Sequence, residues 1–195
     1  GTATAQMLAV FASLPAWTSR ETQALTQPSQ PRFLEEIGRR ALEDPQFCAT
    51  PVLEDAPAEC GPLARCQMHP AVRDLAWHDR IAARAFARLA EFALILRDDS
   101  VAGWIDSAPL GPGVGVAAAE MARGVLVHAV ALENGRIARY AIVAPTEWNF
   151  HPQGALIAEL GGRPVRSADE ARRAMHYAAT TLDPCVALDV ELAHA

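Results

Sequence analysis

Two runs of strand-forming residues joined by Asn-Gly constrain the fold of this chain more than any other feature. The runs cover residues 124–132 and 136–144, and Glu133-Asn134-Gly135 lies between them. Asn-Gly readily adopts the positive φ angles that a tight turn between antiparallel strands requires. The segment therefore predicts a β-hairpin or a small antiparallel sheet.

Helical periodicity dominates much of the remaining sequence. Apolar residues recur at three- and four-residue steps through residues 71–97, which predicts one long helix packed on a neighbour. Residues 32–44 predict a second amphipathic helix. Ser167 and Glu170 form a capping-box pattern, so a third helix is expected over residues 167–180. Four arginines of the long helix are interpreted as a solvated face: Arg73, Arg80, Arg84 and Arg88.

Segments rich in Pro and Gly predict loops. Residues 26–32 and 145–155 are expected to be loops, and residues 45–57 an irregular connector. Residues 4–16 are short and apolar and are expected to form a helix or a core-packing arm. The glycines of residues 107–124 resemble a dinucleotide-binding motif, but Ser and Pro precede and interrupt them where a strand is needed. We expect a loop whose backbone approaches another part of the molecule closely.

Composition excludes some classes of function. The chain has 195 residues, 51% of them apolar, and a formal net charge of −6. That charge argues against nucleic acid as a partner, because a basic surface is expected there. The longest apolar runs are well short of the ~18 residues of a membrane helix. The N-terminus lacks the basic region of a signal peptide, so we expect a cytoplasmic protein without a membrane partner.

The four cysteines are not spaced like a zinc site. They are Cys48, Cys60, Cys66 and Cys185. A disulfide framework is one alternative, but reduced thiols in the cytosol fit a chain of this length better. We interpret Cys60 and Cys66 as structural. We also expect Trp148 in the core, Asn149 bonded to the backbone, and His128 as a satisfied core histidine.

Four motifs of this sequence carry a family resemblance when taken in order: "ECGPLARC", "MARGVLVH", "NGRIARYAIVAPTEWNFHPQGA" and "LDPCVALDV". They resemble the C-terminal half of nickel–iron hydrogenase large subunits, over about residues 59 to 190. The resemblance implies an α+β fold, mainly helical and bundle-like, with a β-hairpin or small antiparallel sheet. We expect one domain over residues 1–195, a fragment of a longer protein, in which 1–58 is a helical N-terminal part with a Pro-rich connector and 59–195 carries the resemblance.

The resemblance also implies a site. Arg123 matches the arginine that hangs over the metal site of the family, and Pro145 with Thr146 matches the pair around an iron-bound cyanide. A guanidinium, a hydroxyl and a backbone N–H suit cyanide because it accepts hydrogen bonds. Cys185 matches the first cysteine of the C-terminal pair and is the candidate metal ligand, whereas Leu188 stands where the second cysteine is expected.

The missing cysteines argue against hydrogenase activity. The N-terminal Cys-x-x-Cys of the family is absent from this chain. One thiolate cannot hold a nickel–iron site that needs four, because soft metals require several soft ligands. We therefore expect no enzyme activity and no nickel.

This pattern resembles hydrogenase accessory proteins of the HupK/HoxV type. The resemblance implies a scaffold or carrier in assembly of the iron–dicyanide–carbonyl unit, with maturation chaperones or the true large subunit as partners. One alternative is an interaction module that binds a maturation chaperone without any metal. A residual hydrogenase is a third alternative that we do not expect.

Overall fold

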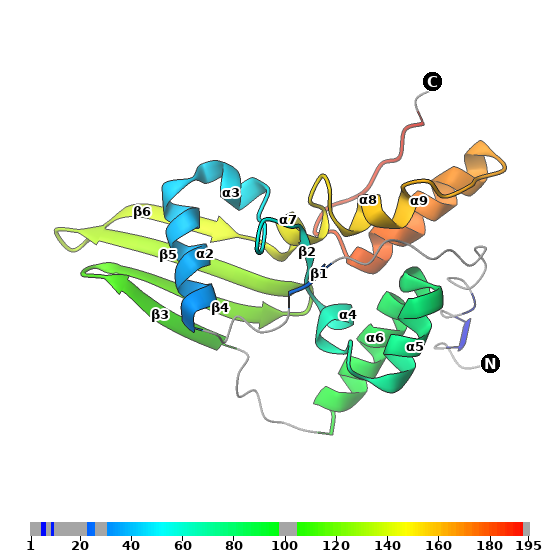
Figure 1. Cartoon of the computed structure of the whole chain (residues 1–195), viewed down its shortest axis with the longest axis horizontal. Coiled ribbons are helices and arrows are strands. Elements are labelled where there is room, and N and C mark those ends of the chain that lie inside the picture. The colour runs from blue at the N-terminus through cyan, green and yellow to red at the C-terminus, as the bar shows by residue number, and fades with distance from the viewer. Residues whose placement is uncertain (1–4, 7–8, 10–22, 26–30, 98–104, 193–195) are drawn as a thin grey trace.

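A four-stranded antiparallel sheet and a group of helices lie side by side in the computed structural model (Figure 1). The structure describes residues 5–6, 9, 23–25, 31–97 and 105–192. The expectation for residues 4–16 lies largely outside the described residues, as does most of the loop expected over residues 26–32. The last two residues of that loop begin helix α2 (Pro31–Glu43) instead. In chain order the elements are β1 (Gln23–Ala24), α2 (Pro31–Glu43), α3 (Pro45–Ala49), β2 (Ala58–Glu59), α4 (Pro62–Arg65), α5 (Pro70–His78), α6 (Arg80–Ile95), β3 (Ile105–Gly111), β4 (Val114–Met121), β5 (Gly124–Glu133), β6 (Arg136–Val143), α7 (Pro145–Asn149), α8 (Ala155–Leu160) and α9 (Ala168–Leu182).

The strands of the sheet follow one another in chain order, β3-β4-β5-β6. The predicted hairpin is β5–β6, and its turn residues Asn134 and Gly135 have φ angles of 51° and 74°. The loop expected over residues 107–124 is wrong, because most of that segment forms the hairpin β3–β4. The small residues of β4 give no recognisable strand pattern in the sequence. Its pairing along the length of β5 supplies the hydrogen bonds that hold β4 in the sheet. The antiparallel hairpin agrees with the rejection of a dinucleotide-binding motif.

Helix α2 covers one face of the sheet (Figure 1). Leu34 and Ile37 of this helix are buried against Val116, Val125 and Val127 of the strands in the main hydrophobic core. The helix is one that the periodicity predicts. Residues 45–57 are not wholly irregular as expected, because α3 forms at Pro45, where the Asp44 carboxylate caps the helix by accepting from the Gln46 N–H.

The long helix expected over residues 71–97 is two helices, α5 and α6, with a break at Asp79. The Asp79 carboxylate accepts a hydrogen bond from the Ala82 N–H and so caps the start of α6. The loop expected over residues 145–155 also begins with a short helix, α7, for which Pro145 provides the first turn. Helix α9 starts as predicted, since the Ser167 hydroxyl accepts from the Glu170 N–H.

The fold class expected from the sequence is confirmed: the described part of the chain is α+β, with several helices beside one antiparallel sheet. Helices α8 and α9 pack on each other around Ala155, Leu156 and Ala178, and this cluster also includes Ile81 of α6. Within the described residues, no helix has the length and apolar character needed to cross a bilayer.

Candidate functional site

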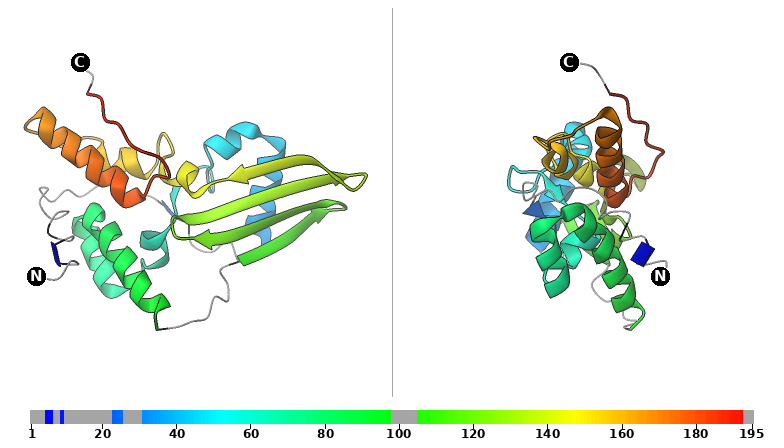
Figure 2. Two further views of the ribbon diagram at one scale, coloured as in Figure 1. Left: turned by 180° about the vertical axis from the view of Figure 1, so that it is seen from behind. Right: turned by 90° about the vertical axis from the view of Figure 1, so that its right-hand side faces the viewer.

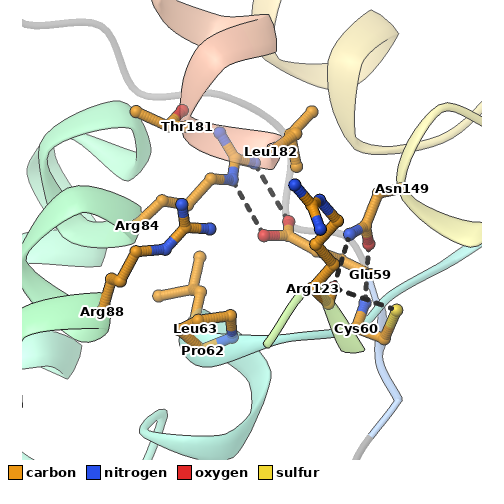
Figure 3. A pocket seen from close by; sticks show the side chains of 10 residues that line it. All are labelled: Glu59, Cys60, Pro62, Leu63, Arg84, Arg88, Arg123, Asn149, Thr181 and Leu182. Atoms are coloured by element: carbon orange, nitrogen blue, oxygen red, sulfur yellow. Dashed lines mark hydrogen bonds and ion pairs between the residues drawn. The ribbon is translucent and has the colours of Figure 1, made fainter. Parts of the chain in front are cut away.

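A small hollow lies where the sheet meets the helices (Figure 3). Its free volume is about 10 Å³, room for about one water molecule. Segments far apart in the chain form its wall, so the site exists only in the folded protein. The lining residues are Glu59, Cys60, Pro62, Leu63, Arg84, Arg88, Arg123, Asn149, Thr181 and Leu182.

Two glycines bring the backbones of this site together. Gly61 and Gly124 have φ angles of 103° and 129°, which other residues rarely adopt. A Cβ on Gly61 would lie 2.8 Å from the Arg123 carbonyl oxygen, and one on Gly124 would collide with the Cys60 Sγ. Only glycine fits at either position. The close approach expected for the glycines of residues 107–124 therefore occurs at Gly124, the last residue of that segment, and it places Arg123 beside the segment that precedes α4.

Asn149 and Cys60 connect this backbone to α7. The Cys60 N–H donates to the Asn149 Oδ1 at 2.9 Å, and the Asn149 Nδ2 donates to the Arg123 carbonyl at 3.2 Å. The Cys60 thiol lies 3.6 Å from the Pro145 carbonyl oxygen, to which it donates. Asn149 bonds to the backbone as predicted, and Trp148 beside it is fully buried, also as predicted.

A buried cluster of charges forms the floor of the hollow. Arg84 is only 3% exposed, and its guanidinium donates to both carboxylate oxygens of Glu59, at 2.8 and 3.0 Å. The same guanidinium reaches Glu159 on α8 at 3.1 Å, while Arg80 reaches Glu59 at 3.2 Å. The solvated face expected for the α6 arginines is therefore wrong for Arg84 and Arg80. The buried carboxylates of Glu59 and Glu159 need these cations as partners, because an unpaired buried charge is costly.

The charges in this cluster support one another. Burial by itself would lower the pKa of Arg84, but the charge and hydrogen bonds of Glu59, with a further contribution from Glu159, raise it. Burial would likewise raise the pKa of Glu59, yet the charges and hydrogen bonds of Arg84 and Arg80 outweigh it and lower that pKa. Both groups are therefore ionised at neutral pH.

Arg88 and Arg123 share one carboxylate at the rim of the hollow. The Asp183 carboxylate lies 3.3 Å from the Arg88 guanidinium and 3.4 Å from the Arg123 Nε, which also donates to the Asp183 carbonyl at 3.2 Å. Asp183 directly follows α9 and has a left-handed φ of 60°. Arg123 does not pair with the nearby Glu120, because that carboxylate pairs with Arg65 at 2.6 Å.

The predicted site residues are only partly brought together. Pro145 contacts the Cys60 thiol through its carbonyl, but neither Pro145 nor Thr146 is among the residues that line the hollow. Cys185 is exposed and also lies outside that lining, although Asp183, two residues earlier, is bound to Arg123. The four predicted residues thus do not form one closed pocket in this structure.

The other cysteines are poor ligands in the folded chain. Burial raises the pKa of the Cys60 thiol to about 12 and also raises the pKa of the Cys66 and Cys48 thiols. Their thiolates are therefore scarce at neutral pH, and thiolates are the metal-binding form. Among the residues that the structure describes, no three His, Cys, Asp or Glu side chains lie close enough to hold a metal ion.

Sequence reasoning missed the charged cluster of Glu59, Arg84 and Glu159. Arg84 lies in the alanine-rich run "IAARAFA", and its neighbours Ala82, Ala83 and Ala85 are also buried. The alanines around Arg84 are the sequence signal for its burial, because small residues leave space for other elements to approach the arginine. The prediction for His128 is correct in that its ring pairs with the Tyr140 hydroxyl, but it is wrong about the core, since His128 is half-buried on the uncovered face of the sheet.

Comparisons with known proteins identify a family for this chain. The family model for nickel-dependent hydrogenase matches residues 98–190. The hydrogenase expression/formation protein HupK of Rhizobium leguminosarum bv. viciae is 32% identical over 170 residues, which are 82% of this chain and 45% of that protein. HoxV of Cupriavidus necator, also a hydrogenase expression/formation protein, is 40% identical over 124 residues, 56% of this chain and 32% of that protein. The chain belongs to the nickel-dependent hydrogenase family, with HupK and HoxV among its similar relatives.

A solved structure of the same family supports the fold. The Ni-Fe-Se hydrogenase from D. vulgaris Hildenborough matches with a TM-score of 0.52 and 23% identity, over 70% of this chain and 36% of that chain. The chain thus spans less than half the length of the curated relatives and of this hydrogenase chain. The family match includes Arg123, Pro145, Thr146 and Cys185, whereas Glu59 and Arg84 lie before the matched residues.

Proposed function

We propose that this chain is part of an accessory protein for the assembly of nickel–iron hydrogenase. In this proposal it carries the iron–dicyanide–carbonyl unit as a transient cargo, without itself being an enzyme. The observation behind the proposal is that Cys185, the exposed thiol among the cysteines, lies two residues after Asp183, the residue through which Arg123 holds the C-terminal segment. A thiolate ligand and a guanidinium donor are thus attached to the same short segment.

The link through Asp183 keeps Cys185 near Arg123. Consecutive Cα atoms are about 3.8 Å apart, so the Cys185 Cα lies within about 7.6 Å of the Asp183 Cα. Arg123 is 41% exposed, so its remaining N–H groups can donate to a cargo outside the hollow. Iron-bound cyanide is an acceptor of such hydrogen bonds. Pro145 and Thr146 do not line the hollow, so the proposal rests on Arg123 and Cys185.

Incomplete ligation suits a carrier. The hollow has room for about one water, so the cargo has to bind at its rim and not inside it. Cys60 is buried with a high pKa and is not available as a second thiolate. A single thiolate with hydrogen bonds around the cargo allows release to the true large subunit.

The test is infrared spectroscopy on the chain purified anaerobically from cells that express the hydrogenase maturation proteins. We expect cyanide and carbonyl bands in the unmodified chain and their loss in Cys185→Ala. Cys48→Ala is the matched control, because Cys48 is half-buried on α3, and it should keep the bands. Arg123→Lys should shift the cyanide bands, since lysine cannot reproduce the guanidinium donors.

A second candidate function is docking of a maturation chaperone without metal. Two observations favour this alternative: the hollow is small, and of the four cysteines only Cys185 is exposed. Under this alternative no infrared bands appear, and Cys185→Ala binds the chaperone as well as the unmodified chain does. Bands that persist in Cys185→Ala would contradict the assigned ligand.

A further inference from the structure

The face of the sheet opposite α2 is uncovered by any described element (Figure 2). Its side chains form cross-strand rows through Leu126, His128, Val130 and Leu132 of β5. All side chains of these rows are apolar or aromatic except Ser107 and His128, and none carries a formal charge when His is neutral. The most exposed apolar residues on this side are Ile105, Met121, Leu132, Ile137, Tyr140 and Ile142.

A solvated sheet face normally looks different. Antiparallel strands with one face in water alternate apolar inward and polar outward residues. Here both faces are apolar, which is the pattern of a sheet covered on both sides. The polar pair on the face is already satisfied, because the His128 Nδ1 and the Tyr140 hydroxyl lie 2.6 Å apart and their rings stack. Covering this face therefore leaves no unpaired charge in the four rows.

We propose that a second copy of this chain covers this face, so that two sheets pack as a symmetric sandwich. Two twisted sheets pack well face to face, with their inner side chains interdigitating. A two-fold axis brings the same surface of both copies together, and residues close to the axis meet their own copies, so a charge there would meet a like charge. The formal charge of the chain is −6, yet these rows carry none, which is the arrangement that self-association requires.

The size of the face is sufficient. Four strands spaced about 4.8 Å apart, each contributing about eight residues at about 3.3 Å, give a face of roughly 500 Å². A single exposed apolar patch of that size is at the upper end for a monomer. Two such faces bury about 1,000 Å² together, near the lower limit for a specific interface. We therefore expect a reversible dimer.

Sedimentation equilibrium of the chain over a range of micromolar concentrations tests this. We expect a monomer–dimer equilibrium whose dissociation constant rises at least about 100-fold in Ile142→Lys, because each copy then buries an unpaired charge. Ile157→Lys is the matched control: Ile157 on α8 is 52% exposed against 43% for Ile142 but lies away from the sheet. The control should dimerise like the unmodified chain.

Further measurements separate loss of the dimer from misfolding and locate the interface. Ile137→Lys, at a more exposed position of the same face, should give the same dissociation, and urea unfolding should show that the variants are folded. In a mixture of differently labelled chains, methyl groups of Val130 and Ala117 should show intermolecular nuclear Overhauser effects. A monomer at every concentration, or a dimer that tolerates Ile142→Lys, overturns the proposal. A monomer that loses binding to a maturation chaperone in Ile142→Lys would also overturn it and assign the face to that partner.

Discussion

The sheet half and the helical junction are held together by different forces. Beneath α2 the core is hydrocarbon, with fully buried residues such as Val125, Val127 and Trp148. At the junction the clusters of small residues are linked by buried charges, above all Arg84 with Glu59 and Glu159. Hydrophobic burial is non-directional and tolerates small shifts, whereas a buried ion pair is favourable only in one geometry. The candidate site therefore lies in the half whose geometry is specified most strictly.

The largest effect should come from breaking the buried ion cluster. We expect Arg84→Met to lower the free energy of unfolding by about 3 kcal/mol, because it leaves two buried carboxylates without their main partner. Arg80 and Arg163 remain near Glu59 and Glu159, which keeps the loss at the lower end of the usual range. Urea unfolding measures the change.

A matched variant separates the charge effect from the loss of packing. Replacing Arg84 by Met together with Glu59→Gln and Glu159→Gln removes the unpaired charges and should recover much of the lost stability. A loss below about 1 kcal/mol for Arg84→Met alone would mean that the junction does not depend on this geometry.

Truncation in the hydrocarbon core should cost less. Val127 is fully buried between α2 and the sheet. Val127→Ala removes two methyl groups, and we expect a loss of about 2 kcal/mol from transfer and cavity terms. Val186→Ala is the control, since Val186 is 75% exposed and should change the unfolding free energy little. A larger loss for Val127→Ala than for Arg84→Met would reverse the contrast between the two halves.

The buried ion cluster should also make the stability of the protein depend on acid. The pKa of Glu59 is lowered below its usual 4.5 by Arg84 and Arg80 in spite of its burial. Its contribution to stability is thus complete above pH about 4.5 and is lost as pH falls through the lower folded pKa. Glu59→Gln should reduce the acid-dependent loss of stability by an amount on the order of 1 kcal/mol. Thermal unfolding at a series of pH values measures this loss. If Glu59→Gln loses as much stability at low pH as the unmodified chain does, Glu59 is not its source.

The smallest effect should arise at the rim. Asp183→Asn keeps a residue that tolerates the left-handed conformation but removes the charge shared by Arg88 and Arg123. These groups are partly exposed, so solvent screens the pair and we expect a loss of about 0.5 kcal/mol that shrinks at high salt. Urea unfolding at two ionic strengths checks this. A loss comparable to that of Arg84→Met would show that the rim belongs to the buried cluster.

Local signals account for the elements that were predicted correctly. Asn134-Gly135 specifies the β5–β6 turn, and Ser167 with Glu170 specifies the start of α9. The β3–β4 hairpin escaped prediction because its residues are small and its strand conformation depends on hydrogen bonds from β5. The break between α5 and α6 at Asp79 was not predicted because the apolar periodicity continues across it, although Asp is a good helix cap.

The site was predictable only in part. Arg123 and Cys185 came from the family resemblance, and the structure connects them through Asp183. Glu59, Arg84 and Glu159 were not predicted, because the pairing joins residues 25 and 75 positions apart and no local pattern encodes such a contact.

The sequence by itself determined the fold class, the β5–β6 hairpin and the family. These follow from turn chemistry, periodicity and motif order, all of which act over short stretches of chain. Only the tertiary structure decided which arginines are buried, which thiol is exposed and which sheet face is left open. Those outcomes depend on what packs against each residue from distant segments, and burial sets the energy of a charge or the pKa of a thiol only after that packing is complete.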